Sequence, residues 1–84
     1  MIRIISFRPF NNDTGAVKAF FDIEYEGIII KGFRLINGSR GLFIKGPEER
    51  GKDDKYYPIL SFIDSSIKDQ IEEQAKNKYE KKGE

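Results

Sequence analysis

The segment around Asn37-Gly38 constrains the fold more than any other part of the chain. Strand-like stretches over residues 28–36 and 42–45 flank it. Asn-Gly between alternating apolar residues is typical of a tight hairpin turn, because both positions tolerate a positive φ. Gly41 offers a further position for a left-handed residue or a bulge before the second strand. The sequence therefore predicts an antiparallel hairpin that turns at Asn37-Gly38.

Positive charge gathers on this hairpin. No Asp or Glu occurs between positions 28 and 47, but four basic residues do: Lys31, Arg34, Arg40 and Lys45. An unopposed positive field of this kind suits an anionic partner. Lys31 and Arg34 are three residues apart, so a regular strand places them on opposite faces, and only a twist or a bulge would unite them. Arg34 is expected to share its face with Ile28, Ile30 and Ile36. A charge in such surroundings favours a paired, structural arginine at an interface over a phosphate ligand.

Residues 16–26 predict a strand with one apolar and one polar face. The apolar face comprises Val17, Ala19, Phe21, Ile23 and Tyr25. Phe20 departs from the pattern because it shares the polar face with Lys18 and Asp22. Aromatic residues near basic ones can stack on unpaired bases, but we interpret Phe20 as a subunit contact. The same face carries Glu24 and Glu26, and a row of carboxylates can bind a hard cation. We expect these carboxylates to be solvated instead.

Further elements lie on both sides of this region. Residues 2–8 predict the first strand, and a turn cluster over 11–15 follows it. Residues 46–55 are rich in charge and predict an exposed loop. Residues 56–62 predict a fifth strand, at a sheet edge because Pro58 cannot donate a backbone hydrogen bond.

Beyond position 62 the apolar period changes from two to four, which predicts a helix. The apolar stripe comprises Ile63, Ile67, Ile71, Ala75 and Tyr79. Ser66 and Asp69 resemble a capping box at its start, and Gly83 would end it. The predicted fold class is therefore α+β. An antiparallel meander of about five strands precedes a C-terminal helix, in a single domain over residues 1–84.

This domain is expected to form a homodimer. The helical stripe is narrow, so it leaves apolar surface at Phe20, Ile28 and Ile30 uncovered. A domain of 84 residues also buries a modest share of its surface, and a second copy would bury more.

Composition limits the chemistry. The chain has no Cys and no His, which removes thiolate chemistry, disulfides and the commonest general base. No motif for a cofactor, metal ion or small-molecule substrate is present, so we do not expect an enzyme. The apolar stretch at 2–6 is too short for a signal peptide, and no segment reaches the roughly 20 apolar residues of a membrane helix. We expect a cytoplasmic protein without a membrane partner.

Residues 33–43 resemble the SpoVG family of bacterial septation regulators. The family pattern there runs roughly I-R-V-I-D-G-x-x-G-L-F, followed by a proline, and this chain matches it at Arg34, Ile36, Gly38, Gly41, Leu42, Phe43 and Pro47. The turn at 12–15 and the helix entry at 63–66 extend the resemblance over nearly the whole chain. It implies a homodimeric regulator that binds DNA or RNA and is linked to gene regulation, cell division and sporulation.

The resemblance also implies a basic surface after the fourth strand. The candidate nucleic-acid-binding residues are Arg40, Lys45, Arg50, Lys52 and Lys55. The family loop commonly reads P-S-K-R, whereas this chain has Glu48 and Glu49 at the middle positions, and two carboxylates repel phosphate. The net charge of +1 gives no further support for nucleic-acid binding. The alternative is therefore a protein-interaction or assembly module that does not bind nucleic acid.

Overall fold

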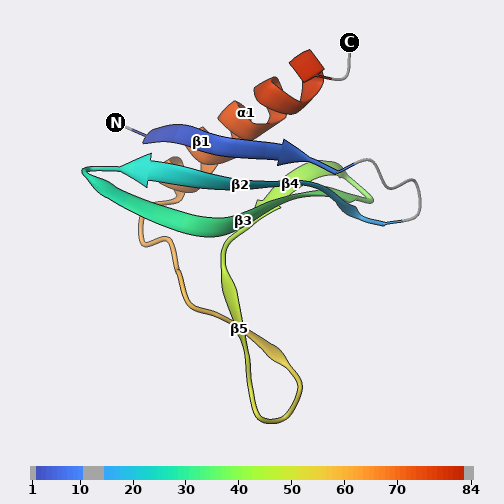
Figure 1. The fold of residues 1–84 in the computed structure, drawn as a ribbon, viewed down its shortest axis with the longest axis vertical. Coiled ribbons are helices and arrows are strands. Elements are labelled where there is room, and N and C mark those ends of the chain that lie inside the picture. The colour runs from blue at the N-terminus through green and yellow to red at the C-terminus, as the bar shows by residue number, and fades with distance from the viewer. Residues whose placement is uncertain (1, 11–14, 83–84) are drawn as a thin grey trace.

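The computed structural model describes residues 2–10 and 15–82, where one four-stranded sheet, one two-stranded ribbon and one helix are found (Figure 1). In chain order the elements are β1 (Ile2–Pro9), β2 (Val17–Tyr25), β3 (Ile28–Gly38), β4 (Gly41–Lys45), β5 (Glu48–Arg50), β6 (Tyr56–Pro58) and α1 (Ser65–Lys82). The sheet has the order β1-β2-β3-β4 with antiparallel pairs throughout. The predicted α+β class and the meander are confirmed.

The core lies between one face of the sheet and α1. Its buried side chains are Ile2, Ile4, Ala19, Phe21, Ile23, Phe33, Leu35, Ile44, Ile71 and Ala75. The rings of Phe21 and Phe33 stack with their centroids 5.5 Å apart and so join β2 to β3. The predicted apolar face of β2 is confirmed, because its central residues are all buried. The opposite face of the sheet, which α1 does not cover, is called the open face below (Figure 1).

The β3–β4 hairpin turns two residues later than predicted. Gly38 pairs with Gly41, so Ser39 and Arg40 form the turn in place of Asn37-Gly38. Gly41 has a φ of 115°, which confirms the expected left-handed position there. Gly38 leaves room for the Phe43 ring, because a Cβ at position 38 would lie only 2.8 Å from Cε1 of Phe43.

A bulge in β3 changes which side chains face the core. Phe33 pairs with Phe21 and Ile30 with Ile23, so the two residues Lys31 and Gly32 lie opposite one residue of β2. Gly32 adopts a φ of 93°. Beyond the bulge the alternation is shifted, and Phe33 points into the core with Ile30. The expectation that Arg34 shares a face with Ile30 is therefore wrong, and Arg34 lies on the open face.

The predicted fifth strand does not join the sheet. Only residues 56–58 of the segment 56–62 form a strand, and they pair with β5 in a separate ribbon. The predicted loop over 46–55 thus contains a strand. Pro58 cannot donate a ladder hydrogen bond, and the next backbone N–H, that of Ile59, donates to the carbonyl of Pro47 (3.1 Å). The ribbon projects from the sheet on the side away from α1 (Figure 1).

Helix α1 begins differently from the prediction. Asp64 is the cap: its Oδ1 accepts hydrogen bonds from the backbone N–H of Ser66 (2.9 Å) and from the Ser66 hydroxyl (2.7 Å). The predicted capping box between Ser66 and Asp69 is absent from the hydrogen bonds of the described residues. Ile63 precedes the helix and is fully exposed, so it does not extend the buried stripe.

Two predicted features fall outside the described residues: the turn at 11–14 and the helix end at Gly83. In the part of the chain that the structure describes, no helix has the length and apolar character that a membrane crossing needs.

Candidate nucleic-acid interface

The five predicted nucleic-acid-binding residues are exposed and lie in three places. Arg40 is at the tip of the β3–β4 hairpin, and Lys45 ends β4. Arg50 ends β5, while Lys52 and Lys55 lie in the turn that connects β5 to β6. The ribbon and the β3–β4 tip point in different directions (Figure 1). The chain therefore presents these cations at separate sites rather than in one patch.

Arg40 lies beside helix α1. It lines a hollow of about 430 Å³ together with Phe43, Glu72 and Lys76. Glu72 and Lys76 pair with each other across one helical turn (3.3 Å). Arg40 has no ion-pair partner among residues 2–10 and 15–82. Lys76 is a basic neighbour that the sequence patterns did not single out.

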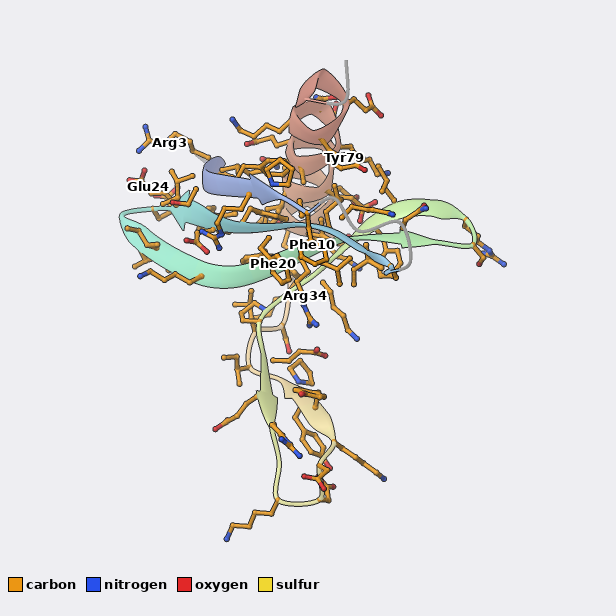
Figure 2. The ribbon with its side chains drawn as sticks, turned by 45° about the vertical axis from the view of Figure 1, so that its right-hand side comes forward. Arg3, Phe10, Phe20, Glu24, Arg34 and Tyr79 are labelled. Carbon is orange, nitrogen blue, oxygen red and sulfur yellow. The ribbon has the colours of Figure 1, made fainter. Side chains whose placement is uncertain are left out.

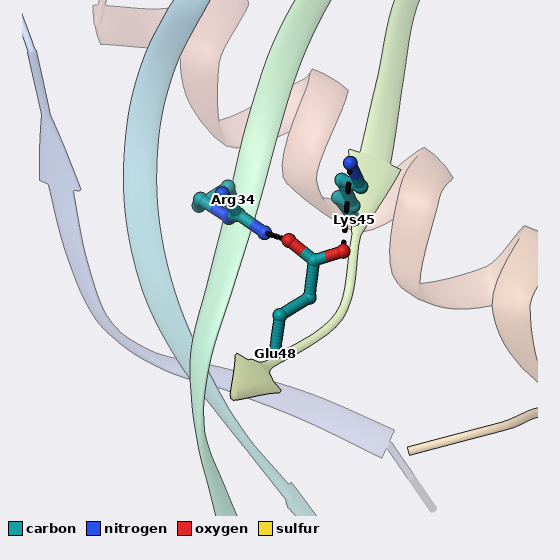
Figure 3. Close-up of polar contacts among 3 residues, drawn as sticks. All are labelled: Arg34, Lys45 and Glu48. Carbon is teal, nitrogen blue, oxygen red and sulfur yellow. Dashed lines mark hydrogen bonds and ion pairs between the residues drawn. The ribbon is translucent and has the colours of Figure 1, made fainter. Parts of the chain in front are cut away.

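Glu48 lies between two cations (Figure 3). One of its carboxylate oxygens accepts a hydrogen bond from the Arg34 guanidinium, and the other lies 3.5 Å from Lys45 Nζ. The hydrogen bond from Arg34, with a smaller contribution from the charge of Lys45, lowers the pKa of Glu48 below its usual 4.5. Glu48 is therefore ionised at neutral pH and neutralises part of the charge that Lys45 would offer to phosphate. The interpretation of Arg34 as a paired arginine agrees with this contact.

The turn of the ribbon is fixed by two aspartates. Asp53 accepts hydrogen bonds from the Tyr57 hydroxyl (2.5 Å) and from the backbone N–H of Lys55 (3.1 Å). These bonds lower the pKa of Asp53, and the bond to Asp53 raises the pKa of Tyr57. Asp54 pairs with Arg50 at 2.6 Å. Among the described residues neither Lys52 nor Lys55 has an ion-pair partner, although residues 48–58 contain four acidic and three basic side chains.

The row of carboxylates on β2 has a structural role. Asp22 is buried, accepts a hydrogen bond from the backbone N–H of Gly32 (3.2 Å) and lies 3.7 Å from the Arg8 guanidinium. It therefore holds the β3 bulge, and the expectation that it is solvated is wrong. Glu24 pairs with Arg3. Within residues 2–10 and 15–82 no group of acidic residues is arranged to hold a metal ion.

The bulge brings together two cations that strand alternation separates. Lys31 and Arg34 line the same hollow of about 340 Å³, together with Tyr56 and Glu48. Arg8 is a further cation of the open face that the sequence patterns did not single out. Its position depends on a second bulge, in β1 between Ile5 and Arg8, and no local sequence signal marks that bulge.

The described residues define a class of small α+β proteins in which a meander sheet is covered on one face by a C-terminal helix and basic residues occupy the hairpin tips. The SpoVG family model matches residues 1–81. The chain belongs to the SpoVG family.

Named relatives support this assignment. A Bacillus pumilus protein named "Putative septation protein SpoVG" is 30% identical over 81 residues, which cover 95% of this chain and 82% of the relative. A Listeria monocytogenes protein named "Putative septation protein SpoVG 2" is 34% identical and covers 83% of this chain and 70% of its own length. An Archaeoglobus fulgidus protein, also named "Putative septation protein SpoVG", is 26% identical over 58 residues, which cover 68% of this chain and 68% of the relative.

Proposed function

We propose that this chain is a nucleic-acid-binding regulatory protein of the cytoplasm, without enzymatic activity. In this proposal Arg40, Lys45, Arg50, Lys52 and Lys55 contact phosphates of DNA or RNA. One observation carries it: a ribbon that projects from the sheet holds two lysines, Lys52 and Lys55, without an ion-pair partner in the described part of the chain. Exposed cations on a projecting hairpin are typical of backbone contacts to nucleic acids. The names of the relatives concern septation, and we propose cell division or gene regulation as the process served.

Binding is expected to be weak for one chain and stronger for a dimer. Glu48 and Glu49 lie beside the proposed contacts and repel phosphate. Two copies would present the cations twice, and about four phosphate contacts in all predict that log K falls with log salt with a slope of about −3 to −4. Fluorescence anisotropy with labelled DNA and RNA pools at several salt concentrations measures this slope. Arg50→Ala should weaken binding and make the slope shallower.

A double replacement tests the role of the acidic pair. Glu48→Ser with Glu49→Lys should tighten binding, because it removes the carboxylate that Lys45 now faces and adds a cation. Asp69→Ser with Glu73→Lys is the matched control, since it makes the same change in net charge on an exposed part of α1. If neither DNA nor RNA binds at low salt, and the Glu48/Glu49 replacement does not restore binding, the proposed function fails.

We also propose that the protein is a homodimer. An apolar groove of about 290 Å³ opens between the β2–β3 hairpin and the start of α1, lined among others by Ile28, Ile63 and Phe62. Ile28 and Ile63 are exposed at its rim. Of the residues expected to need cover, Ile30 is half-buried against the core and so contributes less.

The same groove favours the alternative function, an assembly module. In that case the groove would bind another protein, and the cations would only be solvated. Salt-dependent binding of nucleic acid separates the two functions, because an assembly module would bind neither DNA nor RNA.

A further inference from the structure

Four residues form a continuous row across the open face of the sheet. Arg8 pairs with Phe20, Phe20 with Arg34, and Arg34 with Lys45, so one residue of each strand contributes. Directly paired residues on neighbouring strands lie on the same face of a sheet. Across the full width of the sheet the row therefore consists of a cation, an aromatic ring and two further cations.

Phe20 presents its ring to solvent on this row. It is 37% exposed although it lies on a central strand. Phe10 packs against it edge to face, with ring centroids 6.0 Å apart and an interplanar angle of 82°. Figure 2 shows Phe10, Phe20 and Arg34 close together on the side of the sheet away from Tyr79 of α1. The contact with Phe10 restrains the Phe20 ring while part of the ring stays exposed to solvent.

The ribbon of β5 and β6 adds a second wall beside this row. Tyr56 of β6 is 63% exposed and lines the hollow of about 340 Å³ that Lys31 and Arg34 also line. A second aromatic ring thus stands beside the row, with a further cation next to it. The row has three cations against the carboxylates of Asp22 and Glu48, and Lys31 adds a fourth cation.

We propose that the open face binds single-stranded nucleic acid, with unpaired bases stacked on Phe20 and Tyr56 and phosphates held by Arg8, Lys31 and Lys45. The proposal rests on the proposed function and names the kind of nucleic acid that is bound. Ring faces combined with cations bind single strands without regard to sequence, because every base has a π-face. A four-stranded sheet offers room for about two or three bases.

Charge favours this occupant over a second copy of the chain. In a symmetric dimer the same surface meets itself, so the cations of one open face would lie against the cations of the other. Each open face has four cations against two carboxylates, and burying this excess of positive charge is costly. A nucleic-acid strand supplies one negative charge per phosphate instead. A duplex fits less well, since its bases are stacked on each other and cannot cover Phe20.

Glu48 regulates access to the row. Its carboxylate already holds Arg34 and Lys45, so a phosphate that binds Lys45 has to replace it (Figure 3). Glu48→Gln keeps the shape of the side chain and removes its charge. This variant is expected to tighten the binding of single strands more than that of duplexes.

The test compares a labelled oligothymidylate of about 12 nucleotides with a duplex of the same length, by fluorescence anisotropy at fixed salt. The single strand should bind at least about fivefold more tightly. Phe20→Leu and Tyr56→Leu should each weaken single-strand binding about tenfold and leave the duplex unchanged. Ile59→Ala is the control, because Ile59 directly follows β6, is exposed and does not line the hollow. Circular dichroism verifies that each variant is folded.

A second readout places the contact directly. The chain has no Trp, so Tyr56→Trp introduces a single reporter whose fluorescence should be quenched by the oligothymidylate and not by the duplex. Equal affinities for single strand and duplex, with no effect of Phe20→Leu, would overturn the proposal while phosphate binding by the ribbon stands. A halved mass of Phe20→Leu in light scattering would assign the open face to a second copy and overturn it too. If no nucleic acid binds at all, the proposed function fails first.

Discussion

Gly41 has a φ of 115° next to the two-residue turn of the β3–β4 hairpin. A side chain is disfavoured at this angle even in open space, and no atom outside its immediate neighbours lies within 4 Å of a Cβ built there. Gly41→Val should therefore destabilise the protein through the backbone alone, by about 1–3 kcal/mol. Chemical denaturation measures the change. Gly46→Ala is the control, because Gly46 has an ordinary φ and ordinary contacts. An unchanged midpoint for Gly41→Val would show that the angle carries no strain.

Asp22 and Glu24 lie on the same face of β2 but have different structural roles. Asp22 is buried and holds the bulge through the N–H of Gly32, whereas Glu24 makes an exposed ion pair with Arg3. Asp22→Ala leaves a backbone donor without its partner, so we expect a loss of about 1–3 kcal/mol in the free energy of unfolding. Glu24→Ala should cost less than about 1 kcal/mol. Equal losses for the two variants would contradict the structural role of Asp22.

Helix α1 depends on a titratable cap. The hydrogen bonds from Ser66 lower the pKa of Asp64 below its usual 3.8 in the folded protein. A carboxylate with a depressed folded pKa adds stability above its unfolded pKa, and this stability disappears as the pH falls through the folded pKa. The contribution is therefore complete at neutral pH and is lost below about pH 4.

Replacement by asparagine isolates this effect. Asp64→Asn keeps a capping oxygen but cannot titrate, so its thermal midpoint should depend less on pH between about 2 and 5 than that of the parent protein. Asp69→Asn is the control, because Asp69 is exposed one turn later and caps nothing. Parallel pH profiles for Asp64→Asn and the parent would rule out the cap as their cause.

Sequence patterns predicted the elements that rest on simple periods. The alternation along β2 and the fourfold spacing of Ile67, Ile71 and Ala75 placed the core correctly. They failed where one residue is added to a strand. The bulges after Ile5 and at Lys31-Gly32 reverse the faces of everything beyond them, and each depends on contacts with another strand. The basic residues of the candidate site were visible in sequence, but their separation into three places was not.

The ribbon was missed for a related reason. Its strands of three residues, β5 and β6, are shorter than any periodic signal, and their pairing follows from the turn that Asp53 and Asp54 organise. Asp54 itself has a φ of 65°, which aspartate tolerates better than most residues. The pairing of β5 with β6 therefore determines their strand conformation, which local propensity alone does not predict.

The expected dimer is the property of the whole molecule that is easiest to test. Ile63 is fully exposed at the rim of the apolar groove, so Ile63→Asp should not unfold a single chain but should break a contact made there. Light scattering at micromolar concentration should give twice the 9.7 kDa of one chain for the parent protein and the single mass for this variant. Ile29→Asp is the control, since Ile29 is exposed but does not line the groove. A parent protein of single mass would refute the dimer.

The ribbon of β5 and β6 contributes no buried side chain to the core. Its opening therefore costs its own short ladder and the contacts of Glu48 with Arg34 and Lys45, and its amide protons should exchange with solvent long before those of the central strands. If the ribbon binds nucleic acid as proposed, substitutions at its exposed positions, such as Lys52 and Lys55, change the contacts with the partner without removing a side chain from the core of the sheet and helix.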